Sequence, residues 1–578
     1  MFAWTGPRAE FTVPAIDRGT DWQIALDIRI WRPPGVPLPT VRIRVDGTTA
    51  AEVALTGDRI VTVSAPRRDG ASGMTVTIDT TPSFAPGPGD TRKLGVAIAS
   101  MTVQPIDAAP RAPWLATTYG ATAIFILSAA VAWIGLSPAW VAAFAVFVAW
   151  GAAALVARGV GPYGHYPTHV LLLAASLAAA FVAIAFSIQR RRHESLSTAA
   201  VGAAAICLAA CYLKLLMVLH PDMPIGDGVF HAHRFEYVLA GRLYFTSLTP
   251  DNYAFPYPVF LYLVSAPFAW LTSDTLDRLA LLRIVVTAAD TVAAALLYWM
   301  IVRATADKLA GLAAVLWYHA IPMTAWIMTW SALTNAFAQS LFVASLALVV
   351  GLPVERSNRR TLVMLTIVAS SALLTHPSTC AILVGVLAAT SALYAWRGGD
   401  LRTSAVGVAV ATACAAAIAV VLYYAWFPSV YVSELGRVAS TSVGAASASA
   451  PAASFGTRLA NALGFGEMYF GWAAVAAAAI GTWRLSTQNP SRRLTLLLVA
   501  WAGICLVFLA VGIVTPIEMR YHFAAFPALA IAAGFACSWA WRSRTAVRLA
   551  MWVLVVAGLW DGIAQWLWAM TTYARLVP

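Results

Sequence analysis

Six ionisable side chains crowd a short loop that follows a long apolar run of the chain. The loop, from His220 to Tyr262, reads HPDMPIGDGVFHAHRFEYVLAGRLYFTSLTPDNYAFPYPVFLY. The six that lie close together in its first part are Asp222, Asp227, His231, His233, Arg234 and Glu236. Because only 11% of the chain is charged, such a cluster beside a membrane-length apolar run predicts contact with something polar. We therefore place the candidate chemistry here.

Asp227 is the candidate general base of this loop. It lies between Gly226 and Gly228, which permit a sharp turn, and an amphipathic stretch from Val229 to Leu243 follows. A carboxylate that is partly removed from water is suited to accept a proton from a hydroxyl nucleophile.

Two other interpretations of the same residues stay open. Asp227, His231 and His233 have a spacing that allows a divalent metal, the one cofactor that the pattern suggests, although histidines two residues apart do not share a helix face. A solvated helix N-terminus at the membrane edge explains the same residues without chemistry.

A second set of candidates lies far from this loop in the sequence. Arg520 and His522 open an apolar run, and a guanidinium at the membrane edge can hold a phosphate through two hydrogen bonds. An interfacial anchor that includes Tyr521 is the alternative. His376, at a turn between two short apolar runs, offers one more polar group, although a lone histidine there is more often structural.

Two charges fall inside apolar runs, Lys214 and Asp290. Charges within a membrane are costly, so they indicate function or mutual pairing. We expect Lys214 to belong to the substrate site together with His231, His233, Arg234, Glu236, His376, Arg520 and His522, with pairing to Asp290 as the structural alternative.

Composition defines the elements that must position these residues. Of the 578 residues 60% are hydrophobic, and apolar runs of membrane-spanning length recur, so most of the chain is expected to be transmembrane helix. The net charge of +12 comes mainly from arginines in short connections, which indicates the orientation of the chain in the membrane and not nucleic-acid binding.

The six cysteines lie in apolar runs without a CxxC pair, which argues against disulfides and zinc.

Residues 1–108 differ in kind, because they alternate apolar and polar residues and are interrupted by Pro and Gly. In the stretch from Trp22 to Trp31, every second residue from Trp22 to Ile30 is apolar, which predicts a β-strand with one buried face. Further strands are expected at 41–46, 59–64, 73–79 and 94–103. We predict a small antiparallel β-sandwich, about the size of a jelly roll.

Residues 109–578 are expected to form a polytopic helical domain. About fourteen spans are predicted, at 113–134, 137–157, 167–187, 197–219, 280–302, 309–325, 330–350, 361–376, 378–396, 403–426, 468–483, 494–514, 520–541 and 547–569. If the arginine-rich connections are cytoplasmic, the sheet domain and the loops 220–279, 427–467 and 516–522 share the outer face of a plasma (inner) membrane. This threading requires the apolar segment 255–271 to lie in the interface or to re-enter. Because the sheet domain must then be exported, we also expect a further helix ahead of it, with translocation together with the first helical hairpin as the alternative.

Taken together, several short elements resemble the GT-C superfamily of integral-membrane glycosyltransferases. They are Gly226-Asp227-Gly228, the stretch Val229 to Leu243, the segment Phe255-Pro-Tyr-Pro258 and Arg520-Tyr521, within residues 197–541. The resemblance implies a polyprenyl-phosphate-linked sugar as donor, membrane lipid as surroundings and a glycan, lipid or protein acceptor. It also implies that Asp227 is the base and that Arg520 holds the carrier phosphate. The N-terminal part looks like the jelly-roll-like accessory domains of some bacterial members.

One feature departs from the GT-C pattern, and two other functions remain as alternatives. Asp227 is followed by Gly228, whereas several subfamilies carry two adjacent acids, so metal dependence is open. A lipid-linked sugar flippase would show inverted repeats and polar residues along several spans. A non-catalytic glycan-binding assembly protein would show aromatic residues clustered on one face of the sheet domain, where Trp4, Trp22 and Trp31 are the residues to place.

Overall fold

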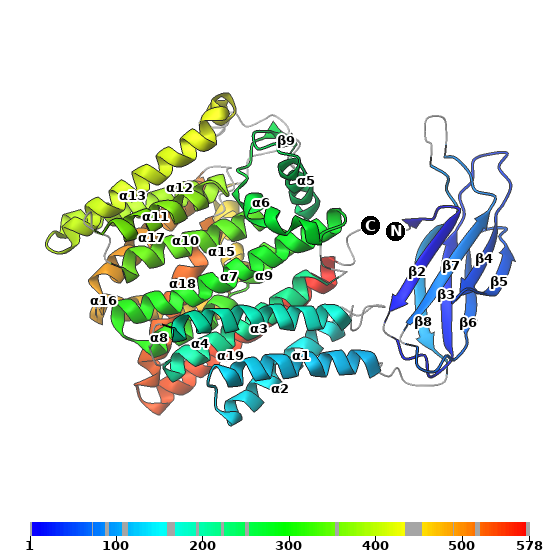
Figure 1. Cartoon of the computed structure of the whole chain (residues 1–578), viewed down its shortest axis with the longest axis horizontal. Helices are drawn as coiled ribbons and strands as arrows, with labels where there is room; N and C mark the ends of the chain where they lie inside the picture. Colours follow the sequence, from blue (N-terminus) through cyan, green and yellow to red (C-terminus); the bar gives the residue numbers. More distant parts are fainter. Residues whose placement is uncertain are drawn as a thin grey trace.

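The computed structural model shows a mostly helical domain with an antiparallel sheet domain at one end (Figure 1). It describes residues 3–573 apart from 15, 72, 87–91, 107–113, 159–167, 192–195, 221–222, 224, 249–253, 353–357, 434–453, 489 and 515–520. The predicted boundary near residue 108 lies outside the described residues, between the last strand and the first helix.

The sheet domain is a sandwich of two four-stranded antiparallel sheets. One has the order β1 (Ala3–Trp4), β8 (Ala97–Pro105), β3 (Trp22–Arg29), β6 (Arg59–Ala65), and the other β2 (Arg8–Pro14), β7 (Gly73–Thr81), β4 (Thr40–Val45), β5 (Thr48–Ala54). The alternation that predicted β3 is confirmed, because Trp22, Ile24, Leu26 and Ile28 are buried between the sheets. The predicted pattern ends there: β3 stops at Arg29, after a register shift between Asp27 and Ile28.

Each of the fourteen predicted spans corresponds to helix in the structure. The helices are α1 (Trp114–Trp133), α2 (Pro138–Arg158), α3 (Thr168–Arg190), α4 (Thr198–Val218), α7 (Thr275–Thr305), α8 (Lys308–Ala320), α9 (Met323–Thr329), α10 (Leu333–Gly351), α11 (Arg359–Leu373), α12 (Pro377–Arg397), α13 (Leu401–Leu422), α16 (Trp472–Gln488), α17 (Arg492–Val514), α18 (Tyr521–Trp541) and α19 (Thr545–Tyr573). Ten described spans are long and apolar enough to cross a membrane. Several of the others, such as α11 with 15 residues, are shorter than a full crossing needs.

The bend between α15 (Phe455–Phe470) and α16 is the sharpest break in a predicted span. The two helices meet at 91° and together would count as an eleventh crossing. Gly471, at the corner, has a φ of +72°, and a Cβ there would lie 2.3 Å from Asp561 Oδ2 on α19. Only glycine therefore fits this elbow without strain.

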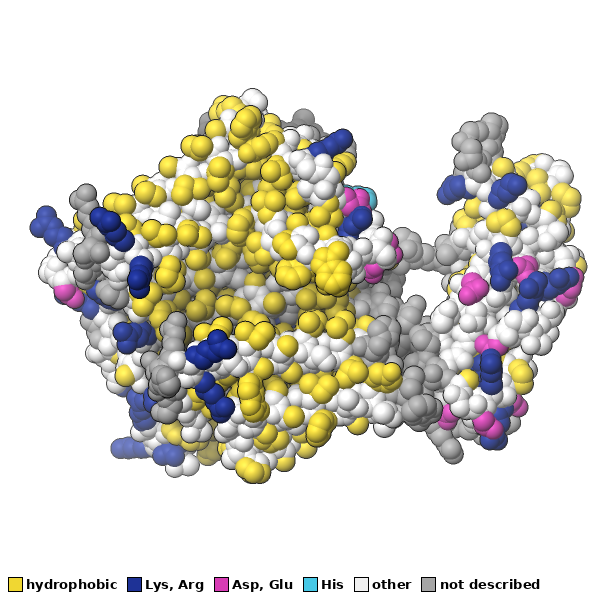
Figure 2. Space-filling view, viewed as in Figure 1, with side chains coloured by type: hydrophobic (Ala, Val, Ile, Leu, Met, Phe, Trp, Pro, Cys, Tyr) yellow, Lys and Arg dark blue, Asp and Glu magenta, His cyan; other side chains and the backbone are white. Residues whose placement is uncertain are grey.

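The two ends of the helical domain differ in their content of basic side chains. Figure 2 shows Lys and Arg gathered mainly at the end away from the sheet domain, where α3, α7, α12 and α18 finish. At the opposite end lie α5 (Gly228–Leu239), β9 (Ser247–Leu248), β10 (Ala254–Phe255) and the short helices α6 (Phe260–Ser265) and η1 (Ala266–Leu271) (Figure 1). The apolar segment Phe260–Leu271 is shorter than a full crossing needs, and its re-entry stays a prediction.

Candidate functional site

Asp227 is the N-cap residue that immediately precedes α5, at the end of the helical domain that faces the sheet domain (Figure 1). Its backbone N–H donates to Trp330 O at 3.2 Å, and its side chain makes no capping hydrogen bond to the helix. The residue is half-buried. The helix that it opens ends at Leu239, four residues earlier than the amphipathic pattern predicts, because Gly241 adopts a φ of +78°.

The glycines on either side of Asp227 allow close packing, which the sequence interpretation did not anticipate. A Cβ on Gly226 would lie 2.6 Å from Trp330 O, and Gly226 has a φ of +47°. A Cβ on Gly228 would lie 2.8 Å from the Leu279 side chain of α7. The loop is thus pressed against the turn between α9 and α10, and the position of Asp227 is set by that contact.

A buried arginine that sequence analysis missed supports the same turn. Arg283 of α7 donates from Nη1 to Val218 O at 2.9 Å and from Nη2 to Ser331 Oγ at 3.0 Å. Ser331 is fully buried with a φ of +52°. The guanidinium therefore ties the carbonyl end of α4 to the turn that holds Asp227. A charge inside a predicted span was the available signal for Arg283.

Trp330 also joins this turn to the beginning of α18. Its ring lies 6.4 Å from that of Phe523 and 5.4 Å from that of Tyr469, measured between centroids. Tyr469 in turn stacks on His522 at 5.0 Å. One aromatic cluster, formed by Trp330, Tyr469 and Phe523, therefore contacts both Asp227 and His522. Arg520 lies outside the described residues, so its convergence with Asp227 stays a prediction.

The buried face of α5 packs against the segment that follows it. His231 shares a 2.8 Å hydrogen bond between Nδ1 and Tyr262 Oη, and burial raises the pKa of Tyr262 to about 12. Arg234 is 1% exposed and donates to the carbonyl oxygen of Tyr257. Its guanidinium also lies 4.4 Å from the centre of the Phe245 ring. Arg234 thus anchors the loop and is buried, and its predicted part in substrate binding stays a prediction.

The other predicted site residues divide between this cluster and the surface. His376 lies 5.8 Å from the Tyr257 ring and pairs through Nδ1 with Ser378 Oγ at 2.9 Å. Glu236 accepts from Arg278 of α7, which makes it a link between α5 and α7. His233 is exposed on the outer face of α5.

The metal interpretation does not fit the described residues. Among them, no three His, Cys, Asp or Glu side chains come together as ligands would. His231 uses Nδ1 for Tyr262, and His233 points to the other side of the helix. Asp222 lies outside the described residues.

Lys214 lies away from the site residues, in the interior of the helical domain. It is fully buried and forms an ion pair with Asp290 of α7. Tyr318 Oη of α8 donates to the same carboxylate at 2.7 Å. Of the two interpretations of these charges, the structure shows the mutual pairing. All six cysteines are free, as the sequence indicated.

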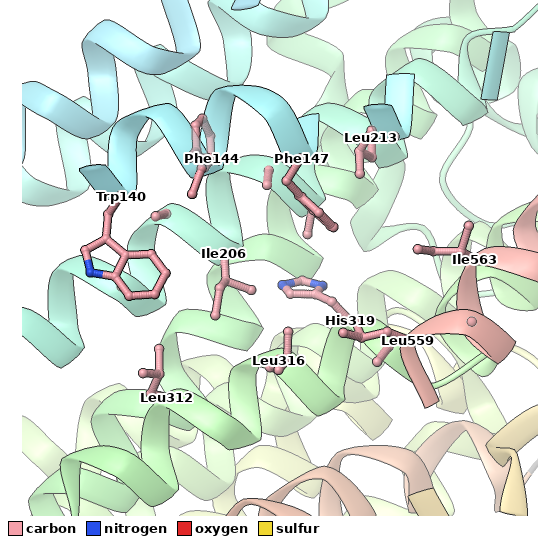
Figure 3. A pocket seen from close by; sticks show the side chains of 18 of the residues that line it. Trp140, Phe144, Phe147, Ile206, Leu213, Leu312, Leu316, His319, Leu559 and Ile563 are labelled. Atoms are coloured by element: carbon pink, nitrogen blue, oxygen red, sulfur yellow. The ribbon is translucent and has the colours of Figure 1, made fainter. Parts of the chain in front are cut away.

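A large apolar cavity of about 660 Å³ lies between α2, α4, α8 and α19 (Figure 3). Phe144, Phe147, Ile206 and Leu316 are among the residues that line it, and His319 projects into it. Both ring nitrogens of His319 are buried without a hydrogen-bond partner in the described structure. The cavity is separate from Asp227, and its lining suits a hydrocarbon chain better than a sugar.

Comparisons with known proteins identify no family for this chain. No family model matches the chain, and no curated protein matches it. One matching solved structure is the crystal structure of the Archaeoglobus fulgidus oligosaccharyltransferase in complex with zinc and sulfate, with 15% sequence identity and a TM-score of 0.43. The match covers 65% of this chain and 53% of that one, so the chain spans about half the length of the archaeal protein. A likeness of this degree does not transfer an activity or a site from one chain to the other.

Proposed function

We propose that this chain is a membrane glycosyltransferase that moves a sugar from a polyprenyl-phosphate carrier to a hydroxyl acceptor, with Asp227 as general base. The observation that carries the proposal is the placement of Asp227. It is a half-buried carboxylate at a helix N-terminus, held through Trp330 against the beginning of α18. In the proposal, that end of the domain is the outer side of the membrane.

The proposed step is an inverting displacement. The acceptor oxygen forms a bond to the anomeric carbon while the bond from that carbon to the phosphate oxygen breaks, and the phosphate leaves with the electron pair. The acceptor proton passes to Asp227. Phosphate is a competent leaving group, so the protein has mainly to position the reactants, remove the proton and stabilise the phosphate charge. In the proposal Arg520 supplies that last function.

The apolar cavity supports a lipid-borne donor. Its lining residues on α4 extend from Thr198 to Leu213, which is about 22 Å of helix at 1.5 Å per residue. That length exceeds one leaflet, since the whole hydrocarbon core is about 30 Å thick. A long isoprenoid chain fits this dimension better than an ordinary acyl chain.

The flippase alternative receives less support. A transporter needs polar groups along its pathway, whereas Lys214 and Asp290 are buried against each other, away from the cavity surface. Within the described residues, His319 and Thr198 are the polar exceptions in an otherwise apolar lining.

Replacement of the proposed base tests the function. Asp227→Asn in the purified full-length chain, supplied with polyprenyl-phosphate sugars extracted from membranes, should lower transfer by about 10²- to 10⁴-fold. Asp400→Asn is the matched control, because Asp400 also precedes a helix without making a side-chain cap, at the opposite end of the domain. Product formation is followed by mass spectrometry. Near-normal turnover by Asp227→Asn would remove Asp227 from the mechanism.

A further inference from the structure

Three aromatic rings meet on the sheet domain, where β1, the end of β3 and the bridge from Phe84 to Leu94 come together. The Trp4 ring is edge-on to Trp31 at 6.4 Å and to Phe84 at 5.6 Å, and Trp31 lies 5.8 Å from Phe84. Phe84 is only 5% exposed, whereas Trp31 is 54% exposed. We call Trp4, Trp31 and Phe84 the aromatic corner. Phe84 forms its buried base, and Trp31 forms its exposed side.

Arg32 completes the corner and has no acidic partner among the described residues. Its guanidinium carbon lies 4.6 Å from the centre of the Phe84 ring, and Nη2 donates to Gly95 O at 3.2 Å. Nε and Nη1 are buried and have no hydrogen-bond partner in the part of the chain that the structure describes. Burial accordingly lowers the pKa of Arg32 from its ordinary value. Buried donors without acceptors are rare in proteins, and a bound group with oxygen acceptors would satisfy both of these N–H groups.

The backbone beneath Arg32 is fixed, which keeps these donors in place. Thr5 Oγ1 both donates to Val96 O and accepts from Val96 N, each at 3.0 Å. A Cβ on Gly95 would lie 2.3 Å from Gly6 O, so only glycine allows this close approach of the two strands. The carbonyl of Gly95 that holds Arg32 is therefore part of a tightly packed sheet edge.

We propose that this aromatic corner is a binding site for an anionic saccharide. The C–H face of one sugar ring stacks on Trp31. The ligand displaces the atoms that cover Nε and Nη1 of Arg32, and these two N–H groups then donate to a carboxylate oxygen and a neighbouring hydroxyl. An anion is required because a half-buried guanidinium without a counter-charge favours one. Lys93, exposed next to Leu94, adds positive charge at the rim.

A membrane surface is the competing partner for exposed tryptophan beside basic residues. Side chains that anchor a protein to lipid extend their charged ends outward. Arg32 instead withdraws its guanidinium over Phe84, with two nitrogens out of reach of solvent. Such a recessed cation suits a small ligand that enters the corner. The site lies on the sheet domain and does not depend on the proposed transfer reaction.

The test is binding of defined oligosaccharides to the purified full-length chain by isothermal titration calorimetry. Oligogalacturonate is the anionic probe, and a neutral malto-oligosaccharide of the same length is the comparison. Trp31→Ala and Arg32→Gln should each weaken oligogalacturonate binding by about tenfold or more, as expected for the loss of a hydrogen bond to a charged group or of a ring contact. Trp31→Phe should retain most of the affinity.

Two exposed positions on β6 provide matched controls. Ile60→Ala removes an apolar side chain that is 63% exposed, and Arg59→Gln removes an exposed cation. Neither should change binding. Equal affinity for the neutral probe, binding that Trp31→Ala and Arg32→Gln leave intact, or Trp31-dependent binding to sugar-free anionic vesicles would each overturn the proposal. Asp227→Asn should bind oligogalacturonate normally, which separates this site from the proposed transfer.

Discussion

Lys214 and Asp290 form an ion pair in the interior of the helical domain, 76 residues apart in the chain. Tyr318 donates a second hydrogen bond to the carboxylate, so the charge of Asp290 is shared between two donors from α4 and α8. The pair thus fastens α7 to both neighbouring helices. The pairing is the structural alternative that the sequence offered for these two charges, and both side chains are buried.

Removal of one member of this pair should destabilise the protein strongly. Lys214→Met leaves the Asp290 carboxylate buried without its counter-charge, and we expect a loss of about 3–5 kcal/mol in the free energy of unfolding. Lys214→Met combined with Asp290→Leu should recover most of that loss, because no isolated charge remains. Thermal unfolding in detergent measures both. A single variant as stable as the wild type would show that the pair contributes nothing.

Gly226→Ala should impair transfer by displacing Asp227. The new Cβ meets Trp330 O at 2.6 Å, so the beginning of α5 must move away from the turn. A misplacement of about 1 Å near reacting groups can cost about 10²-fold in rate. Gly241→Ala is the control, because Gly241 has a φ of +78° but no atom within 4 Å of its Cβ position. It shares the backbone strain without the collision, and an equal loss of rate in both variants would contradict the explanation.

Arg234→Met should loosen the loop that carries the candidate site. The change removes the hydrogen bond to Tyr257 O and the contact with the Phe245 ring, which together are expected to stabilise the fold by about 2–3 kcal/mol. Faster hydrogen exchange in peptides covering residues 254–262 is the expected readout. Arg242→Met, an exposed arginine 5.7 Å from the Tyr237 ring, should leave the exchange rates unchanged.

The sheet domain should lose stability in acid through Asp46. Burial raises the pKa of Asp46, but the Thr75 N–H and the Arg18 and Arg68 guanidinium groups outweigh this effect, so its pKa is lowered in the folded state. The stabilisation is therefore present above the pKa of the unfolded chain and is lost as the pH falls through the folded value. Hydrogen exchange of residues 40–54 should accelerate over this acidic range.

Asp46→Asn should abolish this acid sensitivity, because it removes the titrating group. Comparison with the wild type at each pH corrects for the intrinsic pH dependence of exchange. Asp69→Asn, at an exposed ion pair with Arg67, should behave as the wild type does. An unchanged acid response in Asp46→Asn would assign the effect to another group.

Local patterns were enough to predict most elements of the fold. Period-two alternation predicted β3 because one face of the strand is buried against the second sheet. Apolar length predicted the helices. The segment 255–271 was set apart for another reason, because a full crossing there would invert the arginine-rich connections that follow it. The weakly patterned strands β2 and β5 were missed, since their partners β7 and β4 define them more than their own sequence does.

The candidate site was predictable only in part. Asp227 and the beginning of α18 stand out as polar residues beside apolar runs, but their link through Trp330 and Tyr469 does not. That link combines a backbone hydrogen bond with ring contacts between residues distant in the chain, for which a single sequence contains no periodic signal. The positive φ of Ser331 was equally invisible, because residues other than glycine adopt it only under tertiary constraint.

Because of the right-angle bend at Gly471, we expect the thickness of the bilayer to affect the geometry of the candidate site. Because α15 and α16 meet at 91°, we expect a displacement of α16 along its own axis to shift α15 sideways. Tyr469 travels with α15, and its ring is stacked on His522. We therefore expect lipids of different chain length, which shift a spanning helix vertically to match its apolar surface, to alter that stacking without any change in the protein sequence.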